Sequence, residues 1–173
     1  LIEFFKKEKI LEQDIDNLDN VLEKYKNIIN TANENGSESN LRQDIVNFLS
    51  MLYKRRNIVV EDQRLDISIK DDQGTLRAFI EVKRPQNITE MVRPDNVNKK
   101  ALHQIIENYI ENVENGSVDI NYFIITNGLE WFILNDSTLF NNFISNEGFQ
   151  RYTGFCYTGF RDNSFPQKFY NYK

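Results

Sequence analysis

The spacing of the apolar residues changes along this chain, and that change limits the class of fold. Up to Tyr53, apolar residues recur mostly every three or four positions, which is typical of amphipathic helices. From Leu65 to Ile69, and again from Leu76 to Val82, they alternate with other residues, which is typical of half-buried strands. Helical spacing then returns after Lys99. A chain that mixes the two periods in this order is expected to form a mixed α/β domain.

The expected elements follow one another as helix, helix, hairpin, helix and hairpin, before an irregular tail. In chain order they cover residues 1 to about 30, about 40–52, 65–70, 76–83, 99–113, 120–126 and 130–134. We expect Ser39 or Asn40 to cap the second helix. The turns are expected at Asp71–Gly74 and at Asn127-Gly128. This pattern predicts a small mixed sheet of four or five strands, flanked by helices, with an added N-terminal helix.

Length and composition fit one compact domain. The chain has 173 residues, of which 40% are hydrophobic and 27% charged, so wholesale disorder is not expected. No apolar run approaches the roughly 20 residues needed to cross a bilayer, and no signal-peptide pattern opens the chain. The single cysteine, Cys156, cannot form an internal disulfide, which fits a cytoplasmic location. The chain begins with Leu1 rather than Met, so we expect it to be part of a longer protein.

The net charge of −5 does not exclude DNA as a partner, because the charge is unevenly spread. Residues 1–38 hold nine acidic and five basic residues, whereas the remainder holds 17 acidic and 16 basic ones. A basic surface outside the N-terminal helix therefore remains compatible with the composition.

Three charged residues of the first hairpin are the candidates for a metal-binding or catalytic site. Glu81 and Lys83 are two positions apart on one strand, so their side chains share a face, and the hairpin can bring Asp66 beside Glu81. Two carboxylates suit Mg²⁺ or Mn²⁺, and the backbone carbonyl of Val82 can add a third oxygen ligand. Such a metal would polarise a phosphate and acidify a water molecule, while Lys83 would position that water or stabilise the developing charge. The alternative interpretation is a solvated charged surface with no chemical role.

The sequence around these residues resembles a known superfamily. Asp66 followed by Ile80-Glu81-Val82-Lys83-Arg84-Pro85 is similar to the motif of the PD-(D/E)XK nucleases. More narrowly, the chain resembles the N-terminal cleavage domain of type IIG restriction-modification enzymes. Lys100-Ala101-Leu102-His103-Gln104 and the stretch IITNGLEWFIL from Ile124 onward resemble the pieces that follow the catalytic hairpin in that family. The similarity covers about residues 36–145.

The resemblance implies a restriction-endonuclease-like core and specific roles. Asp66 and Glu81 match the metal-binding carboxylates and Lys83 the catalytic lysine. Glu38 is the best match for an acidic residue on the preceding helix, with Asp44 as the alternative. Gln104 matches a glutamine that contacts the site or the DNA, although Tyr109 follows it by five residues rather than four, and Leu65 stands where the family often has proline.

The implied activity is Mg²⁺-dependent hydrolysis of DNA phosphodiester bonds, with Mn²⁺ as a substitute. The implied partner is double-stranded DNA, with its backbone contacted by the cations that follow the motif: Arg84, Arg93, Lys99 and Lys100. A dimer on DNA is also expected. Methyltransferase and specificity domains are expected elsewhere in the parent chain, and S-adenosylmethionine would be a cofactor only if a methyltransferase domain follows.

Other functions stay open. The chain could be a catalytically silent, nuclease-like module that binds DNA or protein, the nuclease part of a type I restriction subunit, or a plain interaction domain.

His103 is interpreted as a surface or hydrogen-bonded residue and Cys156 as a buried or incidental thiol. Lys54-Arg55-Arg56 fits a helix C-terminus and a phosphate contact equally well. We divide the chain into an N-terminal helix and linker at 1–35, a nuclease core at 36–145 and an aromatic-rich tail at 146–173, whose aromatic residues are expected to pack rather than to stack on bases.

Overall fold

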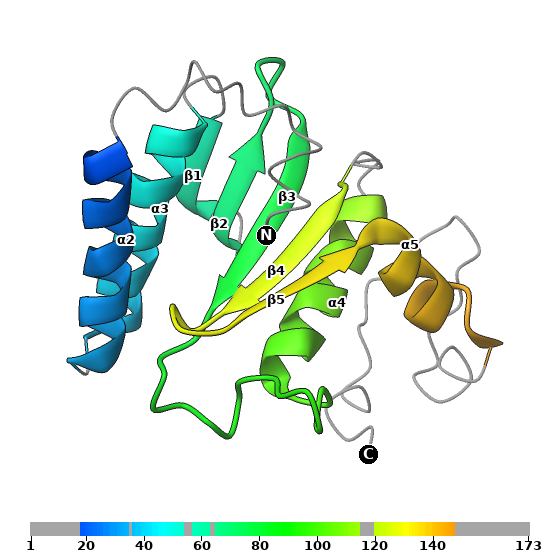
Figure 1. The fold of residues 1–173 in the computed structure, drawn as a ribbon. Helices are drawn as coiled ribbons and strands as arrows, with labels where there is room; N and C mark the ends of the chain where they lie inside the picture. The colour runs from blue at the N-terminus through cyan, green and yellow to red at the C-terminus, as the bar shows by residue number, and fades with distance from the viewer. Residues whose placement is uncertain (1–17, 35, 54–56, 63–64, 115–119, 148–173) are drawn as a thin grey trace.

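The computed structural model describes residues 18–34, 36–53, 57–62, 65–114 and 120–147. The described helices and strands alternate in a mixed α/β order, as the sequence predicts (Figure 1). In chain order they are α2 Leu18–Asn33, α3 Glu38–Leu52, β1 Asn57–Asp62, β2 Leu65–Lys70, β3 Leu76–Val82, α4 Lys100–Glu114, β4 Tyr122–Thr126, β5 Trp131–Asn135, α5 Asp136–Leu139 and a π-helical turn Phe140–Ile144.

The strands form one five-stranded sheet in the order β1-β2-β3-β4-β5. Neighbouring strands are antiparallel except β3 and β4, which are parallel and joined through α4. The expected mixed sheet with flanking helices is therefore confirmed. Because β3 and β4 are parallel, their carboxyl ends meet at one end of the sheet. The N-termini of α3 and α4 lie at this same end (Figure 1).

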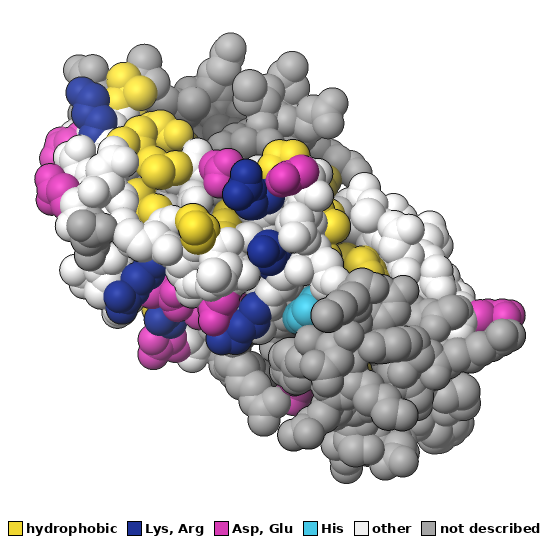
Figure 2. Space-filling view, turned by 90° about the horizontal axis from the view of Figure 1, so that it is seen from below, with side chains coloured by type: hydrophobic (Ala, Val, Ile, Leu, Met, Phe, Trp, Pro, Cys, Tyr) yellow, Lys and Arg dark blue, Asp and Glu magenta, His cyan; other side chains and the backbone are white. Residues whose placement is uncertain are grey.

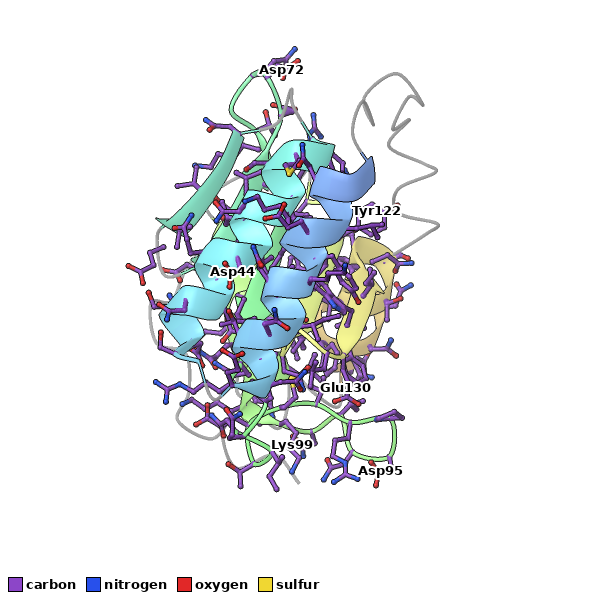
Figure 3. All side chains as sticks on the ribbon, turned by 60° about the vertical axis from the view of Figure 1, so that its left-hand side comes forward. Asp44, Asp72, Asp95, Lys99, Tyr122 and Glu130 are labelled. Carbon is purple, nitrogen blue, oxygen red and sulfur yellow. The ribbon has the colours of Figure 1, made fainter. Side chains whose placement is uncertain are left out.

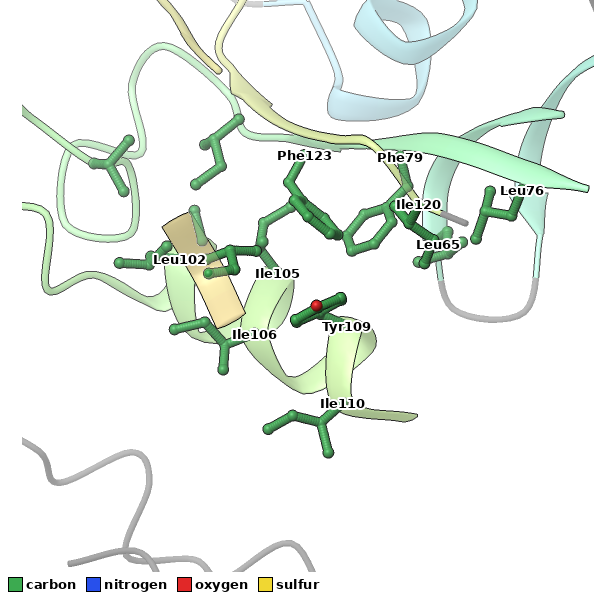
Figure 4. Close-up of a cluster of buried hydrophobic side chains, with 14 of the residues drawn as sticks. Leu65, Leu76, Phe79, Leu102, Ile105, Ile106, Tyr109, Ile110, Ile120 and Phe123 are labelled. Atoms are coloured by element: carbon green, nitrogen blue, oxygen red, sulfur yellow. The ribbon is translucent and has the colours of Figure 1, made fainter. Parts of the chain in front are cut away.

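Apolar residues fill a layer on each face of the sheet. One layer joins α2 and α3 to Ala78, Ile80 and Val82 of β3. The other joins α4 to Phe79 and Phe123, whose rings pack edge to face with centroids 4.9 Å apart (Figure 4). Strand β3 is thus covered on both sides, so charged residues near its end do not automatically face solvent.

Strand β1 was not predicted. Its apolar run Ile58-Val59-Val60 is short and lies between charged and polar residues, so it shows neither helical spacing nor alternation. Pairing with β2 at the edge of the sheet makes it a strand. The sheet therefore has five strands, within the four or five expected.

Two local expectations are wrong. Helix α3 is capped by Ser37, whose Oγ accepts a hydrogen bond from the Asn40 N–H at 3.0 Å, and not by Ser39 or Asn40. Residues 136–144 are helical rather than irregular, because the Asn135 side chain caps this segment by accepting a hydrogen bond from the Thr138 N–H at 2.8 Å. The rest of the predicted N-terminal helix at 1–17, the basic run 54–56, and the tail from 148 on with Cys156 lie outside the described residues.

None of the helices in the described part of the chain combines the length and the apolar character that crossing a bilayer requires.

Candidate functional site

The register of β2 and β3 brings Asp66 beside Glu81. Ile67 pairs with Ile80 across the two antiparallel strands, so the next position of the same register sets Asp66 opposite Glu81. The Asp66 Oδ2 accepts a hydrogen bond from the Val82 N–H at 2.8 Å. The two carboxylates therefore share the end of the sheet where β3 finishes.

Glu81 and Lys83 form a buried ion pair. Their Oε1 and Nζ atoms are 2.5 Å apart, and the two residues are only 2% and 4% exposed. The backbone holds Lys83 in place, since its N–H donates to the Thr126 carbonyl of β4 at 2.9 Å. A solvated charged surface is therefore the wrong interpretation for these two residues, because both are removed from water.

Burial changes how these two side chains titrate. Burial and then the nearby Asp66 charge raise the pKa of Glu81 to about 7, against the opposing effect of Lys83. Burial lowers the pKa of the Lys83 ammonium, but the charge and hydrogen bond of Glu81, together with the charges of Glu38 and Asp66, outweigh it, so that pKa lies above its ordinary value. Lys83 is therefore protonated near neutral pH, whereas Glu81 changes its charge there.

Arg42 of α3 is a member of this site that the sequence did not reveal. Its guanidinium lies 2.8 Å from Glu61, 3.3 Å from Asp66 and 3.9 Å from Glu38. The side chain of Arg42 is only 15% exposed. The spacing of Glu38 and Arg42, one helical turn apart, was the available signal, but it predicts only a surface pair.

The two candidate acids of α3 lie in different surroundings. Glu38 begins the helix, and its charge acts on both Glu81 and Lys83. Asp44 instead accepts a hydrogen bond from the Thr31 hydroxyl at 2.6 Å and so joins α3 to α2 (Figure 3). Of the two, Glu38 is the one that the structure brings toward the predicted site. The turn acid Asp72 lies at the opposite end of the molecule from Lys99 (Figure 3).

Gln104 is half-buried and Val82 is fully buried. Gln104 lies on the second turn of α4, and its side-chain oxygen is buried with no hydrogen-bond partner among the described residues.

The cations predicted to contact DNA lie after β3, on its loop and at the start of α4. Arg84 is exposed and Lys99 half-buried, whereas Arg93 pairs with Asp95 at 3.4 Å and Lys100 with Glu90 at 2.9 Å. Figure 2 shows this end of the molecule, where acidic and basic side chains are interspersed over the described surface. His103 lies 2.6 Å from the Asn98 side chain, and burial lowers its pKa.

The carboxylate oxygens of Asp66 and Glu81 are ligands of the kind that a hard divalent cation prefers. Among the described residues no group of three acidic, histidine or cysteine side chains converges closely enough to hold a metal. Mg²⁺ commonly uses only one or two carboxylates and completes its shell with water and substrate oxygens. Asp66 and Glu81 meet that smaller requirement, and a cation beside them would favour the charged form of Glu81.

The fold and site define a mixed α/β domain in which a buried carboxylate and lysine meet a partly buried carboxylate at the end of a sheet. The chain belongs to the family described as Domain of unknown function (DUF7149), whose model matches residues 1–172. Neither a curated protein nor a solved structure matches the chain.

The raised pKa of Glu81 has a consequence for folding stability. A carboxyl that ionises at about 7 when folded, against 4.5 when unfolded, keeps a proton that the unfolded chain has already released. Its contribution to stability is therefore present below about pH 4.5 and is lost as the pH rises through about 7. We expect wild type to lose up to about 3 kcal/mol relative to Glu81→Gln between about pH 5 and pH 8, measured by urea unfolding. A constant difference between the two proteins over this range would contradict the assignment.

Proposed function

We propose that this chain is a metal-dependent endonuclease domain with a restriction-endonuclease-like core, most similar in role to the cleavage module of a type IIG restriction-modification enzyme. The buried Glu81–Lys83 pair beside Asp66, at the end of the sheet, is the observation that carries the proposal. Burying a carboxylate and an ammonium together costs free energy, and such buried ionisable groups are common in catalytic sites.

The order of elements supports the same proposal. Helix α3 precedes the β2–β3 hairpin with Asp66 and Glu81, with the edge strand β1 between them; α4 with Gln104 and then the β4–β5 hairpin follow. This is the order in which the resembled family carries its motifs. Glu38 at the start of α3 lies close enough for its charge to act on Glu81.

Asp66 and Glu81 would hold the Mg²⁺ or Mn²⁺ ion, and the Val82 carbonyl is a further candidate ligand. When bound, such an ion supplies Lewis-acid polarisation of the phosphate and acidifies a water molecule. The Val82 N–H fixes one Asp66 oxygen, so the carboxylate is oriented before any ion arrives.

Lys83 would act as a cation rather than as a base. The pKa of its ammonium lies above the ordinary value, so it keeps its proton near neutral pH. A fixed positive charge beside the reacting phosphate stabilises the negative charge that develops there. Its burial at the end of β3 keeps it in position without a rearrangement.

Duplex DNA would approach the end of the sheet, with Arg84 and Lys99 as the first backbone contacts. Arg93 and Lys100 would have to leave their acidic partners Asp95 and Glu90 to join them. Dimerisation on DNA, and methyltransferase and specificity domains in the parent chain, belong to the same proposal. S-adenosylmethionine enters only with a methyltransferase domain.

Nicking of supercoiled plasmid by the purified chain tests the proposal. We expect conversion to open-circular DNA with Mg²⁺ or Mn²⁺ and none with EDTA. Failure to cut at any concentration of either metal would overturn it.

Metal binding is expected to depend on pH through Glu81. Because the pKa of Glu81 is raised to about 7, this carboxyl must lose a proton before it binds a cation. The affinity for Mn²⁺ should rise about tenfold per pH unit below about pH 7 and level off above it. Calorimetric titrations in two buffers with different ionisation enthalpies would measure the released proton. Affinity that stays constant over this range would contradict the role of Glu81 as a ligand.

A catalytically silent DNA- or protein-binding module is the second candidate. One observation favours it: both carboxylates already have a cationic partner, Lys83 for Glu81 and Arg42 for Asp66. In that case the chain would bind DNA without needing a metal. Equal DNA binding with Mg²⁺ and with EDTA, and no nicking, would identify this function.

A further inference from the structure

Three acidic residues occupy the same level of three neighbouring strands. Val60 pairs with Ile67 and Asp62 with Leu65, so Glu61 of β1 lies at the register position of Asp66. Asp66 in turn lies opposite Glu81, one position beyond the Ile67–Ile80 pair. Arg42 reaches the first two of these acids from α3.

The backbone at Glu61 supports a specific role for this residue. Glu61 has a φ of 54°, the one left-handed non-glycine backbone among the described residues. This conformation is costly for an ordinary side chain and is kept only where other contacts hold it. Here the Glu61 carboxylate accepts a hydrogen bond from Arg42 at 2.8 Å, which is shorter than the 3.3 Å between Arg42 and Asp66.

Asp66 has a partner on each oxygen. The Val82 N–H holds Oδ2 at 2.8 Å, and the guanidinium of Arg42 lies 3.3 Å from Oδ1. The amide is neutral and leaves the charge of the carboxylate available, but the guanidinium neutralises it. A divalent cation that binds Asp66 must therefore compete with Arg42.

The net charge of these side chains also favours a divalent cation at the site. Glu38, Glu61, Asp66 and Glu81 face Arg42 and Lys83, which leaves a net charge of −2 when all four acids are ionised. One divalent cation would balance this charge. Glu61 offers Arg42 another carboxylate, so the guanidinium can leave Asp66 without becoming an unpaired buried charge.

We propose that Arg42 is a positioning residue that balances the charge of Asp66 in the metal-free site and, held by its existing bond to Glu61, gives up Asp66 when a divalent cation binds. The inference rests on the proposed function, because it takes Asp66 as a metal ligand. It adds two residues, Arg42 and Glu61, that the resemblance does not assign. It also gives a reason for the strained backbone of Glu61.

Replacing either partner of the Arg42–Glu61 ion pair should then change the affinity for Mn²⁺, and the two replacements should act in opposite directions. Arg42→Met removes the competitor, so Mn²⁺ should bind roughly tenfold more tightly, as expected for losing one positive charge a few ångströms away in a water-like dielectric. Glu61→Gln removes the alternative partner of Arg42, so Mn²⁺ should bind several-fold more weakly. The change of charge alone would give shifts of the same two signs, so the double variant decides whether Glu61 acts through Arg42.

The test measures Mn²⁺ binding to the full chain by calorimetry at about pH 8 and low salt, for wild type, both single variants and the double variant. In the Arg42→Met background, Glu61→Gln should lose most of its effect, because no guanidinium remains to redirect. Additive effects, or shifts in the same direction, would overturn the role of Arg42, as would the absence of Mn²⁺ binding in all four proteins.

Plasmid nicking by the same four proteins separates this inference from the proposed function. Opposite and non-additive shifts in Mn²⁺ affinity without nicking would support the role of Arg42 and overturn the nuclease. Metal-dependent nicking with Mn²⁺ affinity that is equal in all four proteins would support the nuclease and overturn the role of Arg42.

Discussion

Replacing Glu81 by Gln should reduce metal-dependent plasmid nicking by at least about a thousandfold, because the site would lose a metal ligand worth several kcal/mol of transition-state stabilisation. Gln keeps the size of the side chain and can still accept a hydrogen bond from Lys83, so the buried packing at the end of β3 is retained. Lys83→Met should reduce the rate of nicking by about a hundredfold or more, because it removes a fixed positive charge beside the reacting phosphate. The measurement is the initial rate of conversion of supercoiled to open-circular plasmid.

Asp72→Asn is the matched control for this experiment. It also changes an acid to its amide, but Asp72 is an exposed residue of the β2–β3 turn, at the opposite end of the molecule from Lys99 (Figure 3). Nicking by Asp72→Asn should equal that of wild type. If Glu81→Gln and Lys83→Met cut as fast as this control, the cutting would come from a contaminant and the assignment of the site would be wrong.

Gly128→Ala should destabilise the chain by about 3 kcal/mol, because the backbone conformation and the packing around Gly128 both oppose a side chain. Gly128 has a φ of 85°, which an alanine adopts only at a cost of about 1 kcal/mol or more. A Cβ there would lie 2.9 Å from the Leu41 side chain and 3.2 Å from those of Ala32 and Ile28. Overpacking of this kind typically adds about 1–3 kcal/mol. Urea unfolding monitored by circular dichroism measures the change.

Gly74→Ala separates the two contributions. Gly74 has nearly the same φ, 82°, but a Cβ there would have no neighbour within 4 Å. It should therefore show the backbone cost alone, about 1 kcal/mol. Equal losses for the two variants would mean that the β4–β5 turn does not pack against α2 and α3 as the structure has it.

The strongest periodic patterns were enough to predict most of the fold. The alternation in Leu65–Ile69 and Leu76–Val82 identified the β2–β3 hairpin, and Asn127-Gly128 identified the turn between β4 and β5. Strand β1 was missed because three apolar residues between polar neighbours show no period. The cap of α3 was misplaced because Ser37 and Ser39 both fit the sequence pattern, and only the backbone geometry selects Ser37.

The candidate site was partly predictable for a similar reason. Asp66, Glu81 and Lys83 could be grouped because a hairpin fixes which residues lie opposite one another. Arg42 and Glu61 could not be found, since their contacts join α3 and β1 to β2 across segments that carry no shared motif. The pairing of Lys100 with Glu90 and of Arg93 with Asp95 was likewise hidden, because it depends on the path of the loop before α4.

The sequence by itself determined the mixed α/β class, the β2–β3 hairpin and the grouping of two carboxylates with a lysine, because these features depend on local periods and on turns between neighbouring strands. The exact register of that hairpin depends on an irregularity between Ile69 and Lys70, which the sequence did not reveal. Only the tertiary structure decided that α4 covers the face of β3 that carries Phe79, and that Glu81 and Lys83 are almost completely buried. Burial depends on which elements pack together over long distances in the chain. That packing removes water from the pair, raises the pKa of Glu81 to about 7 and brings Arg42 to Asp66.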